Sequence, residues 1–382
     1  MVDKNDQKND KIVIAGYART AFQPAKKGKF VKIRPDDLAA AAVKGLIAHS
    51  KLDPALIEDL LLGCAFPEAE QGFNMARMVV LLSGLPISVG GATINRFCGS
   101  SMQSAHSAAG AISLGAGDLY IAAGVESMSR VPLEGFNPMP NPVLATTSPG
   151  AYSSMGQTAE NIAKACKIDR KRQEEFAVLS HQKAGAAQQA GHFKAEIVDL
   201  DGIAEDGCIR PDTNLDDLAG LKPAFDAKGT VTAGTSSPLT DGAVALFICK
   251  YGFAVEAGLT PLAAIKSFAV SGCKPEMMGL GPIESSKKAL ARAGLTASDL
   301  DLVEINEAFS AQAIASIDQL GLDMARVNLD GGALALGHPL GATGARILGK
   351  AASLLQREDK QFALATQCIG GGQGIATILE RV

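Results

Sequence analysis

Two cysteines far apart in the chain each stand where a reactive thiol can be built. Cys98 lies in the sequence INRFCGSSMQ and Cys368 lies in TQCIGGGQG, with His338 between them in GHPLG. A thiol becomes a nucleophile or a base when a helix N-terminus or an imidazole lowers its pKa. The glycines let a substrate approach the backbone closely. Together these segments predict catalysis by thiols.

Each residue also has a plainer interpretation. Cys98 follows an expected strand, and Ser100 and Ser101 are good N-caps for the helix after it, whose positive end favours a thiolate. This setting favours a reactive Cys98 over an inert buried thiol. For His338 a surface turn, and for Cys368 a strand-end thiol in a tight turn, remain open when each is taken alone.

A fourth segment, NEAF, begins at Asn306 directly after an expected strand. Asn306 can hold a water molecule, and Glu307 can orient an imidazole. The alternative is an ordinary helix cap followed by a core phenylalanine, and without the other segments that alternative is favoured.

Hydrophobic periodicity indicates alternating strands and helices, which favours a largely parallel sheet. Asp36 is the expected N-cap of the first long helix. The second half of the chain repeats the plan of the first, so we expect two related α/β halves that send strand ends to a shared site. The expected strands are 11–16, 57–63, 92–95, 119–124, 262–269, 302–305 and 362–366, and the expected helices are 36–49, 101–114, 158–190 and 283–293.

Between the halves, residues 129–240 break the pattern with closely spaced prolines and then a charged helical stretch. A long excursion of this kind is suited to holding a ligand.

Composition excludes several classes of protein. The chain has 382 residues and a formal net charge of -4, which argues against nucleic acid as the main partner. Its seven cysteines are odd in number and include no C-x-x-C pair, so we expect reduced thiols in a cytoplasm and no metal site. The polar start, Met1–Lys8, predicts a tail rather than a signal peptide, and no apolar run predicts a membrane span. The glycines form neither a P-loop nor a G-x-G-x-x-G motif.

Taken together, the motifs closely resemble the thiolase family over nearly the full chain. The matching segments are NRFCGS from residue 95, TAGTSS from 232, NEAF from 306, GHPLG from 337 and CIGGGQG from 368. Within that family the chain is most similar to bacterial 3-ketoacyl-CoA thiolases of fatty-acid β-oxidation. The resemblance implies an α/β thiolase fold with duplicated βαβαβαββ halves in five αβαβα layers. The implied parts are an N-terminal half (1–128 plus 241–258), an inserted loop domain that binds coenzyme A (129–240) and a C-terminal half (259–382).

The resemblance also implies roles for particular residues. Cys98 would be the acylated nucleophile, and Cys368 the acid and base at the substrate's α-carbon. His338 would activate Cys98 and bind the enolate oxygen beside a water held by Asn306. The backbone N–H groups of Cys98 and Gly370 would form a second oxyanion hole. Positions matching coenzyme A and substrate contacts are Met155, Phe225, Ala233, Ser237, Met278 and Phe309.

The implied activity is thiolytic cleavage of 3-ketoacyl-CoA, giving acyl-CoA and acetyl-CoA. Coenzyme A would be a substrate, and no tightly bound cofactor is expected. Thiolases are dimers or tetramers, so a homo-oligomer is expected, with a multifunctional β-oxidation subunit as a further candidate partner.

Three other functions are compatible with parts of the sequence. A biosynthetic acetyl-CoA C-acetyltransferase would make acetoacetyl-CoA, but Ser154 stands where many such enzymes have histidine, and Pro238 replaces a small residue common in the family. A condensing enzyme of the same broad fold typically pairs two histidines with one cysteine. A non-catalytic carrier would not need two activated thiols.

Overall fold

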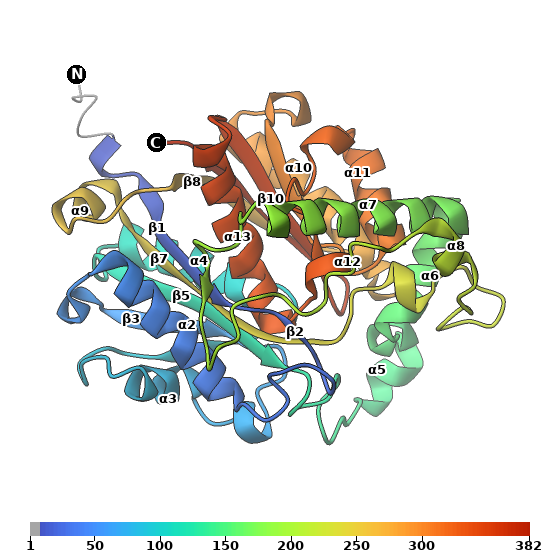
Figure 1. Cartoon of the computed structure of the whole chain (residues 1–382), viewed down its shortest axis with the longest axis horizontal. Helices are drawn as coiled ribbons and strands as arrows, with labels where there is room; N and C mark the ends of the chain where they lie inside the picture. The colour runs from blue at the N-terminus through green and yellow to red at the C-terminus, as the bar shows by residue number, and fades with distance from the viewer. Residues whose placement is uncertain (1–7) are drawn as a thin grey trace.

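Strands and helices alternate along the chain in a computed structural model that describes residues 8–382 (Figure 1). The polar tail expected at Met1–Lys8 therefore lies outside the described residues, apart from Lys8. The strands are β1 (Ile12–Thr20), β2 (Gln23–Pro24), β3 (Asp59–Gly63), β4 (Ala92–Ile94), β5 (Leu119–Ser127), β6 (Ile197–Val198), β7 (Thr240–Lys250), β8 (Ala263–Gly272), β9 (Leu302–Ile305), β10 (Phe362–Ile369) and β11 (Gln373–Glu380).

Helices connect most of these strands. They are α2 (Pro35–Ser50), α3 (Met75–Leu82), α4 (Ser100–Ser113), α5 (Pro142–Thr147), α6 (Met155–Ala165), α7 (Arg170–Gln189), α8 (Leu215–Ala219), α9 (Tyr251–Glu256), α10 (Gly281–Ala293), α11 (Ser310–Leu320), α12 (Ala333–Leu336) and α13 (Leu340–Arg357). Within residues 8–382, no helix combines the length and the apolar character needed to cross a membrane.

The strand order confirms that the chain is built from two related halves. One half runs β4-β3-β5-β7-β1, and the other runs β8-β11-β10-β9 in mirrored order along the same path. A parallel bridge between Val303 and Val327 stands where β4 stands in the first half. β1 and β8 share only two residue pairs, Val13 with Ala264 and Ile14 with Ala263. The two halves of the sheet are therefore joined by only this short pairing.

The two halves place different residues at equivalent positions. The last parallel pair of β3 and β5 is Gly63 with Gly124, and that of β9 and β10 is Ile305 with Thr366. Two residues further along β5 stands Glu126, and two further along β10 stands Cys368. Duplication therefore gives one half a carboxylate where the other half has a thiol.

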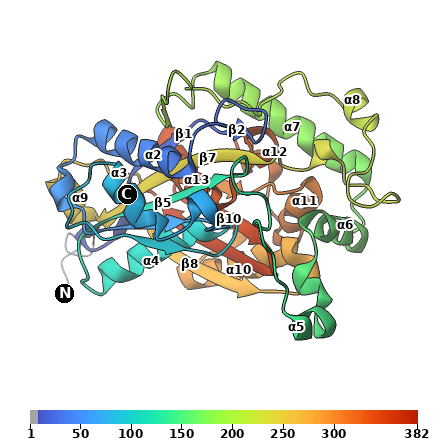
Figure 2. The same ribbon diagram turned by 90° about the horizontal axis from the view of Figure 1, so that it is seen from below.

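Alternating side chains explain the layers. Along β1, Val13 and Ala15 face the core under α2 and α3, whereas Ile14 faces the core around α4 and α13. On the far side of the second half, α10 and α11 cover the remaining face. The order helix, sheet, helix, sheet, helix confirms the expected layered fold, and Figure 2 shows it from below.

Glycines bring the two central helices together, because α4 and α13 pack against each other and against β5. A Cβ atom at Gly124 would lie 2.2 Å from the carbonyl oxygen of Gly341. A Cβ atom at Gly344 would lie 2.4 Å from the backbone nitrogen of Met102. Only glycine permits so close an approach of backbone to backbone.

The excursion between the halves crosses over to the second half. Helix α7 packs against α11 and α12, and α6 packs against α11, although both helices precede β7 of the first half in the chain (Figure 1). Arg19 of β1 ties this segment down through Asp206 at 2.7 Å and Glu196 at 2.8 Å. The excursion is therefore placed to cover the region where strand ends from both halves meet.

Several sequence expectations need correction. The sheet is mixed rather than largely parallel, because β7 and β11 insert antiparallel strands into each half. The helix expected at 158–190 is two helices, since Asp169 caps α7 and interrupts the run. The N-cap of α2 is Arg34, and Asp36 lies in the first turn, where Pro35 is already helical. The hydrophobic periodicity did not predict strands β7 and β11.

The glycine contacts can be tested with two alanine variants. Gly124→Ala should lower the free energy of unfolding by about 1–3 kcal/mol, because the new methyl group meets backbone that cannot turn aside. Gly110→Ala is the matched control on α4, where a Cβ atom would meet nothing within 4 Å. That variant should be neutral or gain up to about 1 kcal/mol from helix propensity. Equal stability of the two variants in urea unfolding would contradict the role of Gly124.

Candidate active site

Cys98 lies in the tight connection between β4 and α4, and its side chain is buried. The expected caps, Ser100 and Ser101, do not cap the helix, because Gly99 is the N-cap residue. Ser100 instead accepts the N–H of Arg96 and donates to the carbonyl of Phe97. The Ser100 hydroxyl therefore stabilises the turn that carries Cys98.

Burial dominates the acidity of this thiol. It raises the pKa of Cys98 to about 11, although the backbone N–H groups of Gly370 and of Cys98 itself act in the opposite direction. The sequence led us to expect that the helix start favours a thiolate, and burial of Cys98 acts against that effect. The two N–H groups that oppose the rise are the pair expected to form an oxyanion hole, so Gly370 does lie beside Cys98.

Cys368 occupies the end of β10 opposite Gly374 of β11. It is fully buried, and burial followed by the charge of Cys98 raises its pKa well above the usual value. Gln367, the residue before Cys368, donates to the carbonyl of Cys98, so the segments that carry the two thiols are in contact. The structure therefore brings the two thiols from opposite ends of the chain into one site.

His338 is held in one tautomer. Its Nδ1 lies 2.6 Å from the hydroxyl of Thr343, and that hydroxyl donates its only proton to the carbonyl of Pro339. With the hydroxyl proton used in this way, Nδ1 carries the ring hydrogen and donates it, and Nε2 has a lone pair that can accept a hydrogen. Burial, reinforced by Arg346, lowers the pKa of His338 to about 3, so the ring is a neutral base.

Asn306 completes this part of the site from the end of β9. Its amide Nδ2 lies 3.2 Å from Nε2 of His338, and its buried Oδ1 has no hydrogen-bond partner among the described residues. Glu307 does not orient the imidazole as expected. Its carboxylate is taken up by Ser180 and Asn328, so Thr343 performs that task.

Two residues that the sequence did not single out join the halves at the site. Gln367 donates its side-chain amide to the carbonyl of Cys98. Glu126 accepts the N–H groups of Ala65 and Gly341, each at 2.9 Å. Each half therefore fixes the start of the other half's catalytic helix.

The residues expected to bind coenzyme A mostly gather on one side of Cys368. Phe225 meets Phe309 edge to face at 5.9 Å, and the backbone N–H of Ser237 donates to the carbonyl of Ala308. Ala233 is exposed at the start of a short 3-10 helix. Apolar side chains that share one cluster with Cys368 are Met155, Ala159, Val231, Met278, Ala308 and Phe309.

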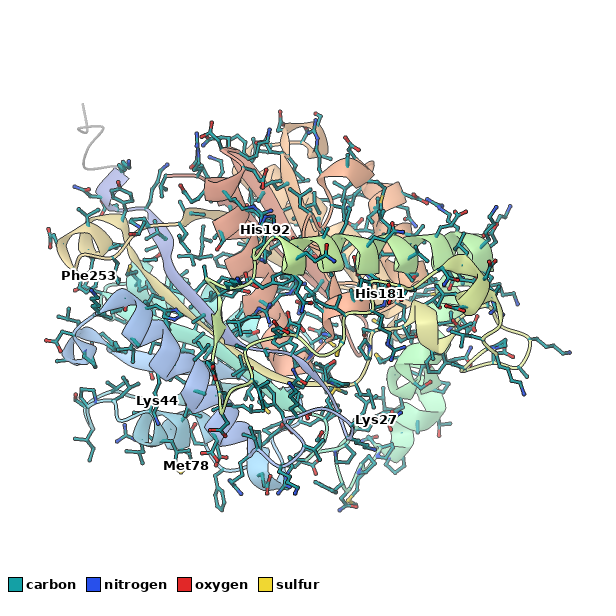
Figure 3. All side chains as sticks on the ribbon, in the orientation of Figure 1. Lys27, Lys44, Met78, His181, His192 and Phe253 are labelled. Atoms are coloured by element: carbon teal, nitrogen blue, oxygen red, sulfur yellow. The ribbon has the colours of Figure 1, made fainter. Side chains whose placement is uncertain are left out.

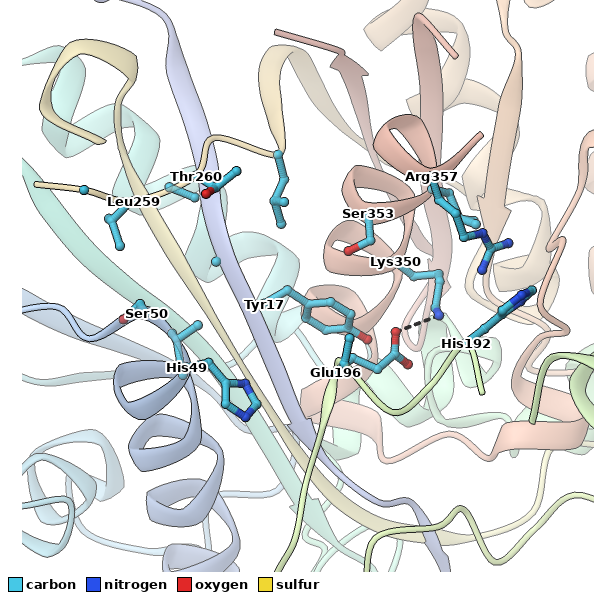
Figure 4. A pocket seen from close by; sticks show the side chains of 17 residues that line it. Tyr17, His49, Ser50, His192, Glu196, Leu259, Thr260, Lys350, Ser353 and Arg357 are labelled. Carbon is cyan, nitrogen blue, oxygen red and sulfur yellow. Dashed lines mark ion pairs between the residues drawn. The ribbon is translucent and has the colours of Figure 1, made fainter. Parts of the chain in front are cut away.

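A separate hollow of about 470 Å³ lies at the far end of α13 (Figure 4). Tyr17, His49 and Glu196 line it, and Lys350 pairs with Glu196 at 2.6 Å. None of the residues expected at the site lines this hollow. In the part of the chain that the structure describes, no group of three His, Cys, Asp or Glu side chains is arranged as metal ligands.

Comparison with known proteins covers almost the whole chain. The family model for "Thiolase, N-terminal domain" matches residues 12–252, and that for "Thiolase, C-terminal domain" matches residues 259–381. A 3-ketoacyl-CoA thiolase of Pseudoalteromonas translucida (strain TAC 125) is 48% identical, with 97% of this chain and 98% of that protein covered. Proteins of the same name from Cronobacter sakazakii (strain ATCC BAA-894) and Bacillus subtilis (strain 168) are 47% and 46% identical. These alignments cover 98% and 96% of this chain, and 100% and 98% of those proteins.

The acidity of the thiol gives a test without substrate. Since burial raises the pKa of Cys98 to about 11, iodoacetamide should modify it faster at each step from about pH 7 to about pH 10, with no plateau. Mass spectrometry of the peptide that contains Cys98 measures this rate. A plateau below about pH 8 would show that the thiolate is already formed in the free protein, and it would contradict the raised pKa of Cys98.

Proposed function

This chain belongs to the thiolase family, and on that premise we propose that it cleaves 3-ketoacyl-CoA with coenzyme A, through an acyl group carried on Cys98. The products are acetyl-CoA and an acyl-CoA shortened by two carbons. The observation that carries the proposal is that Gln367, next to Cys368, bonds to the carbonyl of Cys98, while Asn306 at the end of the neighbouring strand contacts His338.

The first half-reaction needs a nucleophile and a base. Nε2 of His338 takes the proton of Cys98, and the thiolate attacks the C3 carbonyl of the substrate. The bond between C2 and C3 then breaks, and its electron pair passes into the enolate of acetyl-CoA. The thiol of Cys368 gives its proton to C2, which releases acetyl-CoA and leaves the acyl thioester on Cys98.

The second half-reaction returns every proton. The thiolate of Cys368 takes the proton of the incoming coenzyme A, whose sulfur attacks the acyl group on Cys98. Cys98 leaves as a thiolate and recovers its proton from His338. One thioester replaces another of similar energy, so this acyl transfer runs readily in either direction. Backbone N–H groups of Cys98 and Gly370 stabilise the oxyanion of each tetrahedral intermediate.

Asn306 would support the enolate indirectly. Its unpartnered Oδ1 suits a bound water molecule, which together with Nε2 of His338 would meet the enolate oxygen. This is the role that the family resemblance assigns to the residue.

The division of the chain follows the same proposal. Residues 1–128 with 241–258 supply Cys98, residues 259–382 supply Asn306, His338 and Cys368, and residues 129–240 form the loop domain. We assign coenzyme A to the face of that domain beside Met155, Phe225, Ala233, Ser237, Met278 and Phe309. Coenzyme A acts there as a substrate.

The names of the relatives favour cleavage in fatty-acid β-oxidation over synthesis of acetoacetyl-CoA. Ser154 is consistent with this preference, because it serves as the N-cap of α6 rather than presenting an imidazole. Reduced free cysteines, some of them only half-buried, fit a cytoplasmic enzyme.

A homo-oligomer is proposed from the first half of the chain. β4 ends the strand order and so presents an open edge. Phe73 and Ile87 are 96% and 81% exposed, and Leu81 of α3 adds to the apolar surface. Met78 of the same helix is also exposed (Figure 3). A second copy of the chain would cover this surface. A multifunctional β-oxidation subunit is a further candidate partner.

The role of Cys368 is separated from that of Cys98 by comparing two assays. Exchange of labelled coenzyme A into acetyl-CoA moves no proton at C2, whereas cleavage of the C–C bond does. Cys368→Ser should therefore lose most thiolysis, since a hydroxyl is a far weaker acid. It should keep much more of the exchange, because the thiol of coenzyme A can lose its proton to water without Cys368, whereas C2 needs an acid. Cys166→Ser, at the end of α6, is the matched control and should retain both activities. Equal losses in the two assays would give Cys368 a structural role, and full thiolysis would make it an ordinary buried thiol.

Thr343 provides a second test. Thr343→Val removes the acceptor of the Nδ1 hydrogen of His338, which should cost about 1–3 kcal/mol, or about tenfold to a hundredfold in rate. Because His338 serves both half-reactions, thiolysis and exchange should fall together. Thr343→Ser keeps the hydroxyl and should recover most of the rate. A valine variant as fast as the parent would mean that Thr343 does not orient the ring.

A further inference from the structure

The two thiols lie in two separate apolar clusters. The Cys98 cluster consists of Ala65, Cys98, Met128 and Leu340, with Ala25 and Phe66 packed against it. The Cys368 cluster consists of Ala159, Val231, Met278, Ala308, Phe309 and Cys368, with Met155 packed against it. The boundary between the clusters is where a substrate must lie to reach both sulfurs.

The chemistry fixes which cluster receives the acyl chain. Under the proposed function, on which this inference rests, Cys98 bonds to C3 and Cys368 serves C2. The thioester of coenzyme A is attached through C1, beyond C2, and the rest of the acyl chain is attached to C3. The chain must therefore extend away from Cys368 and along the Cys98 cluster.

The ring of Phe97 lies at the boundary between the Cys98 cluster and the Cys368 cluster. Its ring centroid lies 5.8 Å from that of Phe66, at an angle of 44°. A Cβ atom at Gly370 would lie 3.8 Å from the ring of Phe97 and 3.6 Å from the sulfur of Met155. The ring thus extends from Phe66 in the Cys98 cluster to Met155 in the Cys368 cluster, next to the N–H that faces Cys98.

Asn95 links the backbone segments that carry Phe66 and Phe97. It donates to the carbonyl of Ala65 at 3.0 Å and accepts the N–H of Phe97 at 2.8 Å. The neighbouring N–H of Phe66 is fixed by the buried carboxylate of Glu126. The backbones of both loops are therefore fixed, so any adjustment must come from the side chains.

Phe97 is the side chain able to adjust. Its φ of 43° lies in the left-handed region that bulky residues rarely occupy, and strain of this kind gathers at functional sites. Its side chain is 37% exposed, whereas Met128 and Leu340 behind it are buried. The ring can rotate toward solvent at little cost in burial, while the wall behind it stays in place.

We propose that Phe97, backed by Phe66, determines the length of the acyl chain that the site accepts. A methyl group on C3 fits without disturbing the pair of rings. A longer chain must move the ring of Phe97 outward and take its place against Phe66, Met128 and Leu340. Phe97 then discriminates among substrates by acyl-chain length, at a position beside the acylated sulfur of Cys98.

Substitutions at Phe97 should change the preference in opposite directions. For each variant, kcat/KM is measured with acetoacetyl-CoA, 3-ketodecanoyl-CoA and 3-ketohexadecanoyl-CoA. Phe97→Ala should raise the ratio of the longest to the shortest substrate by about tenfold or more, since one methylene in an apolar pocket already changes specificity by about tenfold. Phe97→Trp should lower that ratio. Phe97→Gly relieves the left-handed backbone and serves as a second ring-free variant if the alanine variant folds poorly.

The matched control is Phe253→Ala, which removes a half-buried ring from α9, far from the site (Figure 3). Its ratio should equal that of the parent. An unchanged ratio in both Phe97→Ala and Phe97→Gly would overturn the proposal. So would an equal loss on all three substrates, because it would show a structural role for the ring.

A second readout separates this inference from the proposed function. Acetyl-CoA, decanoyl-CoA and palmitoyl-CoA are each incubated with the protein, and acylation of Cys98 is measured by mass spectrometry. This step needs no C–C cleavage. If thiolysis is absent but Cys98 is acylated, the proposed reaction fails while the chain-length profile still tests Phe97. If the profile is the same in the parent and in the ring-free variants, the inference fails while thiolysis can stand.

Discussion

The close approach of α4 and α13 is the constraint on which the rest of the molecule depends. Both helices begin beside reactive residues. The backbone of α13 meets that of α4 at Gly344 and that of β5 at Gly124 and Gly341. Side chains at these positions would hold the helices apart by more than a hydrogen bond can span. The bonds from Gln367 to Cys98 and from Glu126 to Gly341 would then be lost. Catalytic geometry here follows from the absence of side chains at a packing surface.

Burial determines the protonation states of the thiols and the imidazole in this site. The thiols are protonated, with the pKa of Cys98 near 11, and the imidazole is neutral, with its pKa near 3. An ion pair between Cys98 and His338 is therefore unfavourable in the empty site, because each charge would be buried with little compensation. Under the proposed function, charge would become favourable when a carbonyl oxygen reaches the N–H groups of Cys98 and Gly370. The site would then form the thiolate only when a substrate carbonyl is present to be attacked.

Short motifs at strand ends made much of the site predictable from sequence. Cys98, Asn306 and Cys368 lie at or just after strand ends, His338 lies in the turn between α12 and α13, and the structure brings these four segments together. Thr343 and Gln367 were missed because their partners are set by helix phase and by pairing across the chain, which a local pattern does not encode. The hydrophobic periodicity did not predict strands β7 and β11, because both are buried on both faces and their sequences do not alternate between apolar and polar residues. The family resemblance, with two strands closing each half, did imply them.

The contact between the halves also has a consequence for biosynthesis. Ser101 of α4 receives the backbone N–H of Ala345 of α13, and these residues are 244 positions apart in the sequence. At about 5–20 residues per second, a ribosome needs about 10 to 50 seconds to make the chain between them. Throughout that time the inner face of the first half, with Met102 and Ile112 of α4, has no partner to cover it. The nascent chain should therefore depend on chaperones until α13 emerges, and the active centre can form only at the end of translation.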